Sequence, residues 1–185
     1  MKSVILFYSI IVLALIAILF PRGEILPPLL KLPVKTITVL DGDTINFQGK
    51  KRGRLAYIDA PEKAQLSFDG VAIGLKSKEY LRLLLTSRQE SITLEIRGVD
   101  RYGRFLVQLF VGDTDINYEM VKNGMALLYP FSEFPSGAKR TRYLLAYEWA
   151  KWTRQGVWAA KGFDSPYSFR KKQQQQHPLP SRIRP

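Results

Sequence analysis

The feature that most constrains the fold is the order in which strand-like and helix-like patterns of apolar residues follow one another along the chain. Short β-branched or alternating segments, each followed by turn residues, predict β-strands. The predicted strands cover 34–40, 44–47, 54–58, 92–96 and 105–111. Residues 70–85 interrupt them with apolar side chains at helical spacing. Strand and helix patterns therefore alternate within one domain-sized stretch, which excludes an all-helical fold.

Two further helices are predicted after the last strand. Asp115 is a candidate N-cap for a short helix that ends at Asn123-Gly124, because glycine suits the position after a helix. Apolar residues spaced over 143–150 predict the last helix, and we expect the tryptophans of this region to pack against it. Three strands, a helix, two strands and further helices predict a mainly β, α+β fold. The expected architecture is a five-stranded OB-type barrel with about three packed helices.

Cysteine and histidine usage restricts the chemistry that such a domain can perform. The 185-residue chain has no cysteine, which excludes disulfides, thiol catalysis and the usual structural zinc sites. Its single histidine, His177, lies near the C-terminus, which argues against a Ser-His nucleophile pair. Carboxylates, arginines, lysines, hydroxyls or a hard metal ion remain as the available chemistry.

The N-terminal segment 1–33 is predicted to be a hydrophobic anchor or signal followed by a proline-rich spacer. Val4–Phe20 is an uncharged apolar run at the short end of the length that spans a bilayer. No small-x-small cleavage site follows it, which favours an uncleaved transmembrane helix over a cleaved signal. We therefore expect a membrane-anchored chain whose domain is extracytoplasmic, or a secreted domain if the segment is cleaved. A buried core helix is the alternative.

The positive charge of the chain is unevenly distributed. The net charge is +12, which points to a polyanion or an acidic membrane surface as partner. Residues 165–185 form a basic tail with a four-glutamine tract and no hydrophobic periodicity, and they are predicted to be disordered. The domain between the ends, 34–164, carries only +5, from 20 basic and 15 acidic residues.

Three short motifs place charged residues at predicted strand ends. They are DGDT at 41–44, RLAYIDAPE at 54–62 and DRYGR at 100–104. Each is by itself compatible with an ordinary turn, since Asp-Gly is a favoured hairpin sequence and glycine allows positive φ. In the second motif, Pro61 keeps Ala60 extended, which prevents Asp59 and Glu62 from simply continuing a strand.

Together and in this order, the three motifs resemble those of the staphylococcal nuclease, or thermonuclease-like, family. The resemblance covers 34–158, including the Asn123-Gly124 element and the final Gly156-Val-Trp158. It implies an OB-type barrel with added helices, in a membrane-anchored or exported member of the family. It also implies a Ca²⁺-dependent nuclease that hydrolyses phosphodiester bonds of DNA and RNA with low sequence specificity.

The resemblance further implies a metal site built from carboxylates. Asp43 and Asp59 would be Ca²⁺ ligands, the backbone carbonyl of Ala60 would add a third protein oxygen, and Asp41 would lie just outside the ligands. Ca²⁺ is chemically reasonable because it accepts about 6–8 oxygen ligands in flexible geometry. Water and phosphate would complete the coordination.

The catalytic residues implied by the resemblance are Glu62, Arg54 and Arg104. Glu62 would orient or deprotonate the attacking water, and the sequence leaves both roles open. The two arginines would bind the phosphate from two sides through paired donors, more tightly as charge develops. Hydrolysis of a phosphodiester needs little beyond such positioning and charge stabilisation.

Substrate contacts are expected from three further residues. By the same resemblance Tyr102 would lie beside the bound nucleotide and Arg101 beside backbone phosphates. Tyr129 is a candidate stacking platform for a base, with packing inside the protein as its alternative. We expect DNA and RNA as partners, in single-stranded or flexible regions, and the membrane through the N-terminal apolar helix. No obligate protein partner is inferred.

Two other functions compete with the nuclease. The first is an OB-type module that binds nucleic acid without cleaving it. The second is a membrane-tethered adaptor whose barrel binds a protein, which would account for the two ends of the chain but give the carboxylates and arginines no purpose. Cleavage is favoured because every acidic and arginine position that the family chemistry uses is present.

Overall fold

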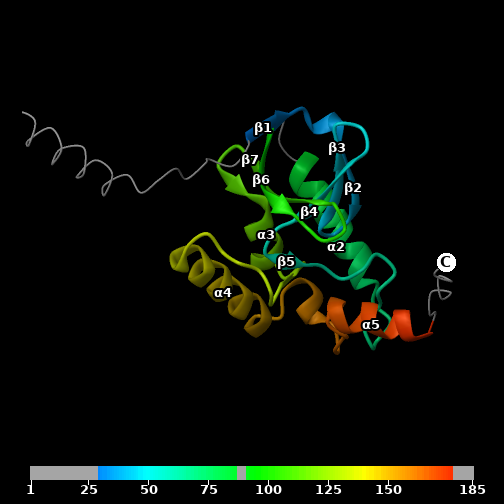
Figure 1. Ribbon diagram of the computed structural model, residues 1–185. Coiled ribbons are helices and arrows are strands. Elements are labelled where there is room, and N and C mark those ends of the chain that lie inside the picture. Colours follow the sequence, from blue (N-terminus) through cyan, green and yellow to red (C-terminus); the bar gives the residue numbers. More distant parts are fainter. Residues whose placement is uncertain (1–28, 87–90, 177–185) are drawn as a thin grey trace, which may run out of the picture.

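The computed structural model describes residues 29–86 and 91–176. Figure 1 shows a strongly curled sheet with helices packed against it. The strands are β1 (Leu29–Leu32), β2 (Ile37–Asp41), β3 (Thr44–Phe47), β4 (Lys51–Leu55), β5 (Ile58–Asp59), β6 (Ile92–Val99), β7 (Phe105–Val111), β8 (Thr114–Asp115) and β9 (Leu127–Leu128). The helices are α2 (Ile73–Thr86), α3 (Ile116–Lys122), α4 (Gly137–Trp152) and α5 (Pro166–Gln176), with 3₁₀ turns η1 (Val34–Thr36) and η2 (Gly156–Ala159).

The main sheet has the strand order β1-β6-β7-β4-β3-β2, and β8 pairs with β7. Strands β2, β3 and β4 form an antiparallel meander, whereas β4 and β7 pair in parallel. The parallel pair joins the meander to the β6–β7 hairpin and curls the sheet into a half-barrel. The predicted α+β class is thus confirmed, and the architecture fits an OB-like fold. The five predicted strands correspond to β2, β3, β4, β6 and β7, to which β1 and β8 are added. Two of the predicted ranges are wrong in part: residues 34–36 form the turn η1, and the strand predicted over 54–58 ends at Leu55, because Tyr57 adopts a φ of +73° that interrupts it before β5.

Strand β1 shows that the prediction of a spacer up to residue 33 is wrong in part. Residues Leu29–Leu32 were expected to be an extended linker, but they pair in antiparallel register with β6, Leu32 opposite Ile92. Proline cannot donate a ladder hydrogen bond, and Pro33 follows the strand without interrupting it, so that the four residues can pair. Leu32 is buried there. The folded unit therefore begins before residue 34.

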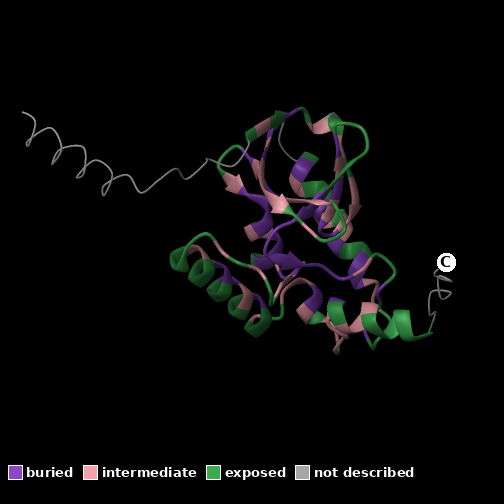
Figure 2. Cartoon of the chain, viewed as in Figure 1, coloured by how far each residue is buried: buried purple, intermediate pink, exposed green. Residues whose placement is uncertain are grey.

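The hydrophobic core lies where the sheet meets the helices, and Figure 2 shows buried segments in both. Helix α2 contributes Leu81 and Leu85 to it, at the spacing of one helical face. Asp115 caps α3 as predicted, because its side chain accepts a hydrogen bond from the Tyr118 amide. The packing of sheet and helices fixes the turns that carry the charged motifs.

Helix α4 packs through Tyr143, Ala146 and Ala150 and leaves its other face to solvent. The expectation that the tryptophans here pack against helices is wrong for two of them, since Trp149 and Trp152 are exposed. Their spacing placed them on the helix but did not determine which face the neighbouring elements cover. Trp158 does pack, with its ring centroid 5.5 Å from that of Tyr147.

The prediction for the C-terminal tail is also wrong in part. Residues 165–185 were expected to be disordered, whereas Pro166–Gln176 form the helix α5. Residues 177–185 lie outside the described residues, and for them the prediction stays untested by the structure. Ser165 accepts a hydrogen bond from the Ser168 amide, and Pro166 occupies the first helical position. Both are typical helix-start signals that the polar composition of the tail obscured.

None of the helices in the described ranges 29–86 and 91–176 is both long and apolar enough to cross a membrane. The apolar run Val4–Phe20 lies outside the described residues. The N-terminal anchor or signal, and with it the extracytoplasmic location, therefore stays a prediction.

Candidate active site

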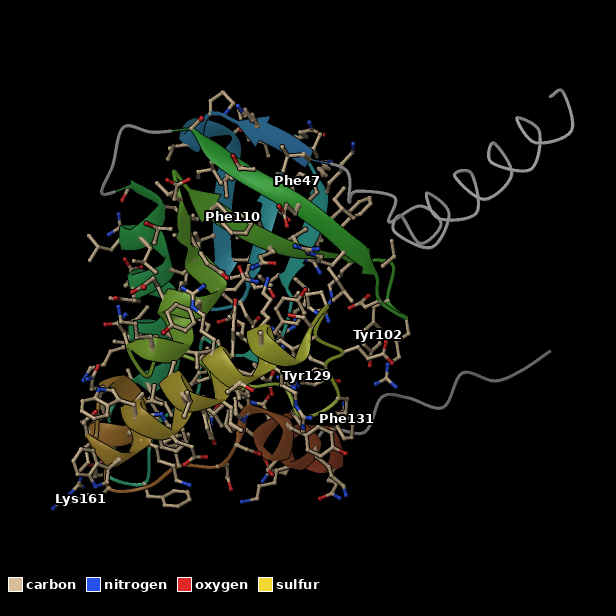
Figure 3. The ribbon with its side chains drawn as sticks, turned by 90° about the vertical axis from the view of Figure 1, so that its left-hand side faces the viewer. Phe47, Tyr102, Phe110, Tyr129, Phe131 and Lys161 are labelled. Carbon is tan, nitrogen blue, oxygen red and sulfur yellow. The ribbon has the colours of Figure 1, made fainter. Side chains whose placement is uncertain are left out.

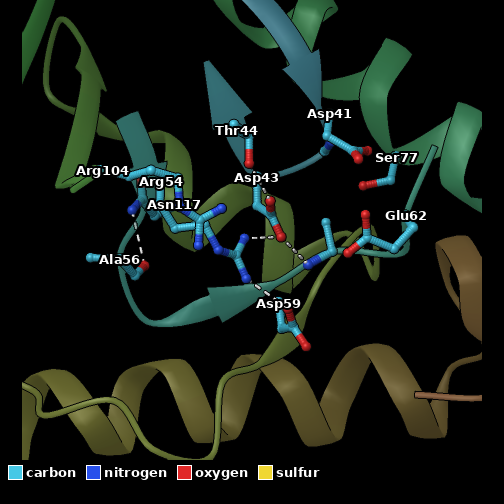
Figure 4. Close-up of polar contacts among 12 residues, drawn as sticks. Asp41, Asp43, Thr44, Arg54, Ala56, Asp59, Glu62, Ser77, Arg104 and Asn117 are labelled. Atoms are coloured by element: carbon cyan, nitrogen blue, oxygen red, sulfur yellow. Dashed lines mark hydrogen bonds and ion pairs between the residues drawn. The ribbon is translucent and has the colours of Figure 1, made fainter. Parts of the chain in front are cut away.

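The register of the sheet brings the three charged motifs to one edge. Thr44 pairs with Arg54 across β3 and β4, so the turn that precedes Thr44 lies against the end of β4. Gly53 pairs in parallel with Phe105, so Arg104, which precedes Phe105, also lies beside β4. Long-range pairing thus places residues from 41–44, 54–62 and 100–104 around the same point, where Figure 4 shows their side chains.

Asp43 is held by neighbouring residues of the turn and of the second motif. Its Oδ1 accepts a hydrogen bond from Thr44 Oγ1 at 3.0 Å, and its Oδ2 accepts one from the Ala60 amide at 2.6 Å. Leu55 donates its amide to the Asp43 carbonyl at 2.8 Å, which ties the turn to the end of β4. The buried Asp43 carboxylate is therefore fixed in place.

Arg54 connects the two predicted metal ligands. Its guanidinium forms ion pairs with Asp43 through Nη1 and with Asp59 through Nη2, the latter at 2.6 Å to Oδ1. All three side chains are buried or nearly so, and Asp59 is only 2% exposed. Burial lowers the pKa of Arg54, Asp59 opposes that shift, and the nearby charges of Arg104 and Arg170 add to it. Two carboxylates and three arginines thus act on one another electrostatically.

Asp41 lies beside this cluster and is within range of the charges of Glu62 and Arg54. Its Oδ1 accepts a hydrogen bond from the Gly42 amide at 2.9 Å, and its Oδ2 accepts one from the Lys63 amide at 3.2 Å. Burial raises the pKa of Asp41, and the charge of Glu62 raises it further, against the lowering effect of the Gly42 amide. Asp41 therefore ties the β2–β3 turn to the loop that carries Glu62.

Two glycines let α2 approach these turns. A Cβ on Gly42 would stand 2.0 Å from Ser77 Oγ, and one on Gly74 would stand 1.7 Å from the Glu62 carbonyl oxygen. The absence of a side chain at both positions is therefore a steric requirement. Helix α2 supports the acidic turns from behind through these contacts.

Glu62 is held by a residue that the motifs did not single out. Gln65 is fully buried, and its Oε1 accepts a hydrogen bond from the Glu62 amide at 3.2 Å, while its Nε2 donates to the Asp164 carbonyl at 2.6 Å. The Glu62 side chain keeps 34% of its area exposed. No spacing signal distinguishes Gln65 in the sequence, because its role depends on a partner 99 residues away.

Arg104 is positioned by its own hairpin. Asp100 accepts hydrogen bonds from the amides of Tyr102 and Arg104 at Oδ1 and from Arg104 Nε at Oδ2, at 2.8–3.0 Å. Although burial alone would raise the pKa of Asp100, the hydrogen bonds from Arg104 and Tyr102 lower it overall. Gly103 has a φ of +77°, as the glycine of the DRYGR turn predicts.

The residues predicted to contact substrate lie on the rim. Tyr102 is 67% exposed, and the Arg101 and Arg104 guanidinium carbons lie 4.8 and 5.5 Å from its ring centroid. Tyr129 is half-buried and its ring contacts the exposed Phe131 edge-on at 5.6 Å. Figure 3 shows Tyr102, Tyr129 and Phe131 along one side of the molecule. Their contacts with a substrate stay predictions.

A further arginine, Arg170, reaches the cluster from α5. Its Nη1 donates to Asp59 Oδ1 at 3.0 Å and to Glu62 Oε1 at 2.8 Å, and its Nη2 donates to Asp59 Oδ2 at 3.1 Å. Burial would lower the pKa of Arg170, but the hydrogen bonds to Asp59 and Glu62 raise it overall. Sequence reasoning missed Arg170 because it assigned this segment to a disordered tail.

The donor set at the cluster suits a hard divalent cation. In the described part of the chain, no three acidic or histidine side chains form a group that could hold a metal ion alone. Asp43 and Asp59 nevertheless meet at one guanidinium, so their oxygens face a common positive charge. Such oxygen ligands, completed by a carbonyl, water and phosphate, are those that Ca²⁺ accepts.

Comparison with known proteins assigns the fold to a family. The model of the staphylococcal nuclease homologue family matches residues 52–160. The chain is 37% identical over 144 residues to an uncharacterized endonuclease of Haemophilus influenzae, covering 75% of this chain and 73% of that protein. It is 34% identical over 149 residues to a micrococcal nuclease of Shigella flexneri, covering 74% and 79%.

The half-barrel and its carboxylate–arginine cluster are thus those of a hydrolase of the nuclease class. The chain belongs to the staphylococcal nuclease family. The predicted resemblance and the predicted enzyme class are thereby confirmed.

Proposed function

We propose that the chain hydrolyses phosphodiester bonds of DNA and RNA with Ca²⁺ as its metal ion. The observation that carries this proposal is the convergence of Asp43 and Asp59 on Arg54 at the edge of the half-barrel. Nucleic acids are favoured as substrates because relatives are named nucleases, and because the positive charge of the chain suits a polyanion. Low sequence specificity fits a site that binds phosphate rather than base edges.

Asp43 and Asp59 would hold the ion, with the Ala60 carbonyl as a third protein ligand and Asp41 outside it. When bound, Ca²⁺ supplies positive charge to the phosphate oxygens and to the leaving group. The structural support is that Asp43 is buried and oriented by hydrogen bonds from Thr44 and Ala60, while Asp59 is buried and pairs with the same guanidinium, that of Arg54. Preorganised charge of this kind is the largest contribution to many enzymatic rates.

Glu62 would act on the attacking water. Its carboxylate remains accessible to solvent, while its backbone is fixed by Gln65 and by the close contact with Gly74. We propose that Glu62 orients this water and accepts its proton as the water oxygen bonds to phosphorus and one phosphorus–oxygen bond breaks. A fixed carboxylate improves the alignment of the water.

Arg54 and Arg104 would bind the phosphate oxygens. Arg54 lies between the two carboxylates, and Arg104 is close enough for its charge to affect the pKa of Arg54. Guanidinium groups present paired donors that match a phosphate, which a lysine cannot do. Arg101, Tyr102 and Tyr129 would contact the adjoining backbone and bases from the rim, where single-stranded or flexible regions fit most readily.

The test is a cleavage assay of the full chain, purified in mild detergent, on single-stranded DNA and RNA oligonucleotides. We expect cleavage in Ca²⁺, none with excess chelator, and recovery when Ca²⁺ is restored. Glu62→Gln should lower the rate by about 100-fold or more, as for a lost general base. The exposed Glu133→Gln, which removes the same charge elsewhere, should cleave at the wild-type rate.

Two results would contradict the proposal. A folded wild-type chain that cleaves neither substrate at any Ca²⁺ concentration would remove the enzymatic function of this site. Binding of oligonucleotides without cleavage would then favour the nucleic-acid-binding module.

A further inference from the structure

Arg170 lies outside the part of the chain that the family model matches, yet it contacts two residues of the candidate active site. The matched residues end at 160, whereas Arg170 is in α5. Its guanidinium donates to both oxygens of Asp59 and to Glu62 Oε1, at 2.8–3.1 Å. Arg170 thus makes a bidentate contact with one carboxylate and a third hydrogen bond to another, which is a more specific geometry than that of a single surface ion pair.

These contacts engage the groups that the proposed function needs. Asp59 Oδ1 accepts from both Arg54 and Arg170, and Asp59 Oδ2 accepts from Arg170. The carboxylate of Asp59 therefore has hydrogen bonds from guanidinium groups at both of its oxygens. A divalent cation needs the same oxygens, and it is repelled by a positive charge a few ångströms away. Arg170 therefore competes with a cation for Asp59, at Oδ1 and at Oδ2.

Helix α5 is attached in a way that allows Arg170 to leave. Pro166, at its first position, is the one residue of the helix that is buried, and the ring of the exposed Tyr167 lies 6.5 Å from that of Phe131. Beyond Arg170, residues 171–176 are exposed, although Lys172 pairs with Asp164 at 2.8 Å. Few apolar contacts would be lost if the helix moved, and segments with few such contacts open most easily.

We propose that Arg170 is a built-in competitor of the metal ion, which closes the active site by pairing with Asp59 and Glu62. The proposal rests on the proposed function, since it takes Asp59 as a metal ligand and Glu62 as the residue that acts on water. Metal binding then requires the guanidinium to withdraw, and the cation concentration at which the enzyme turns on is set partly by α5. Withdrawal also frees Glu62 to contact water.

The test measures Ca²⁺ binding directly, by isothermal titration calorimetry on the full chain in mild detergent. Arg170→Gln removes the competing charge, and we expect its Kd for Ca²⁺ to be at least about tenfold lower than that of the wild type, equivalent to about 1.4 kcal/mol. Lys171→Gln is the matched control, because it removes one positive charge from an exposed neighbour in the same helix. Its Kd should stay within about twofold of the wild type, because an exposed charge is screened.

Hydrogen exchange supplies a second readout. Ca²⁺ should accelerate amide exchange over residues 166–176 of the wild type, because the helix loses its contact with Asp59 and Glu62. The same helix in Arg170→Gln should already exchange at the faster rate without Ca²⁺. Arg170→Lys keeps the charge but loses the bidentate contact, and we expect its Kd to lie between those of the wild type and Arg170→Gln. If Arg170→Gln does not fold, the Kd of Arg170→Lys serves as the test.

The outcomes separate this proposal from the proposed function. Equal Kd values for the wild type and Arg170→Gln, or weaker binding by the variant, would overturn the role of Arg170 while leaving a metal-binding nuclease. Absence of binding by all the folded variants would overturn both proposals together. Tighter binding by Lys171→Gln to the same extent would show a general charge effect and would also overturn the role of Arg170.

Discussion

The two arginines expected to bind one phosphate lie in contrasting regions of the molecule. Arg54 is at the end of β4, buried between Asp43 and Asp59. Arg104 is on the β6–β7 hairpin, where its side chain is 28% exposed and paired with Asp100 of the same turn. The first arginine belongs to a network spread over three elements, whereas the second is held by a residue four positions away.

Two arginines at one site can therefore differ in how strongly the stability of the fold depends on them. Removing Arg54 leaves two buried carboxylates without their shared partner, which is costly in a low-dielectric interior. Removing Arg104 leaves a partly exposed Asp100 that water can solvate. We therefore expect Arg54 to serve both stability and chemistry, and Arg104 to serve chemistry alone.

The largest effect is expected for Arg54→Ala. The free energy of unfolding should fall by about 3–5 kcal/mol, as for one partner removed from a buried ion pair. Cleavage should be lost as well, because the variant lacks a phosphate ligand. Chemical denaturation and the cleavage assay measure the two effects, and wild-type stability in this variant would contradict the structural role of Arg54.

Arg104→Ala comes next and should separate rate from stability. We expect the cleavage rate to fall by about 100-fold, the cost of one lost donor to the developing charge. The melting temperature should stay close to that of the wild type, because the lost ion pair is partly exposed. A near-wild-type rate would remove Arg104 from the mechanism, and a large drop in melting temperature would erase the contrast with Arg54.

A smaller effect is expected where α2 supports the acidic turn. Gly42→Ala should lower the free energy of unfolding by about 1–3 kcal/mol, because its Cβ would overlap Ser77 and Ala60. Gly137→Ala is the control, since a Cβ there meets nothing within 4 Å. Denaturation curves compare the two, and equal stability of both variants would show that the turn is not tightly packed.

The smallest effect concerns the hairpin of Arg104. The pKa of Asp100 in the folded protein lies below its ordinary value of 3.8, so its ionised form stabilises the fold. That stabilisation is complete above pH 3.8 and is lost as the pH falls through the lowered pKa. Asp100→Asn should therefore cost about 1 kcal/mol at neutral pH, and the difference from the wild type should vanish in acid. A difference independent of pH would contradict this interpretation.

Local patterns and motifs predicted much of this structure. Alternating residues identified the five principal strands, and Asp115 and Gly103 matched the cap and turn that their residue types favour. The order of three motifs indicated which strand ends meet. That the three motifs actually converge depends on the parallel pairing of β4 with β7, which no local pattern determines.

The errors occur where a partner far along the chain decides the structure. Strand β1 forms because Leu29–Leu32 pairs with the edge of β6, at least sixty residues later in the chain. Arg170 has its role only because α5 folds back to Asp59, 111 residues earlier. The exposure of Trp149 and Trp152 depends on which face of α4 its neighbours α3, β9 and η2 cover. Composition and spacing carry no information about such partners.

The most direct test of the central claim, that Arg54 and Arg104 act on the same phosphate, is a double-mutant cycle on the cleavage rate. Arg54→Lys and Arg104→Lys keep both charges, so that the fold is retained while the paired donors are lost. If the arginines act together, the double variant should lose no more than about tenfold beyond the slower single variant, because residues that act as a unit are not additive. Rate losses that simply multiply would show that the two arginines act independently and would contradict the account.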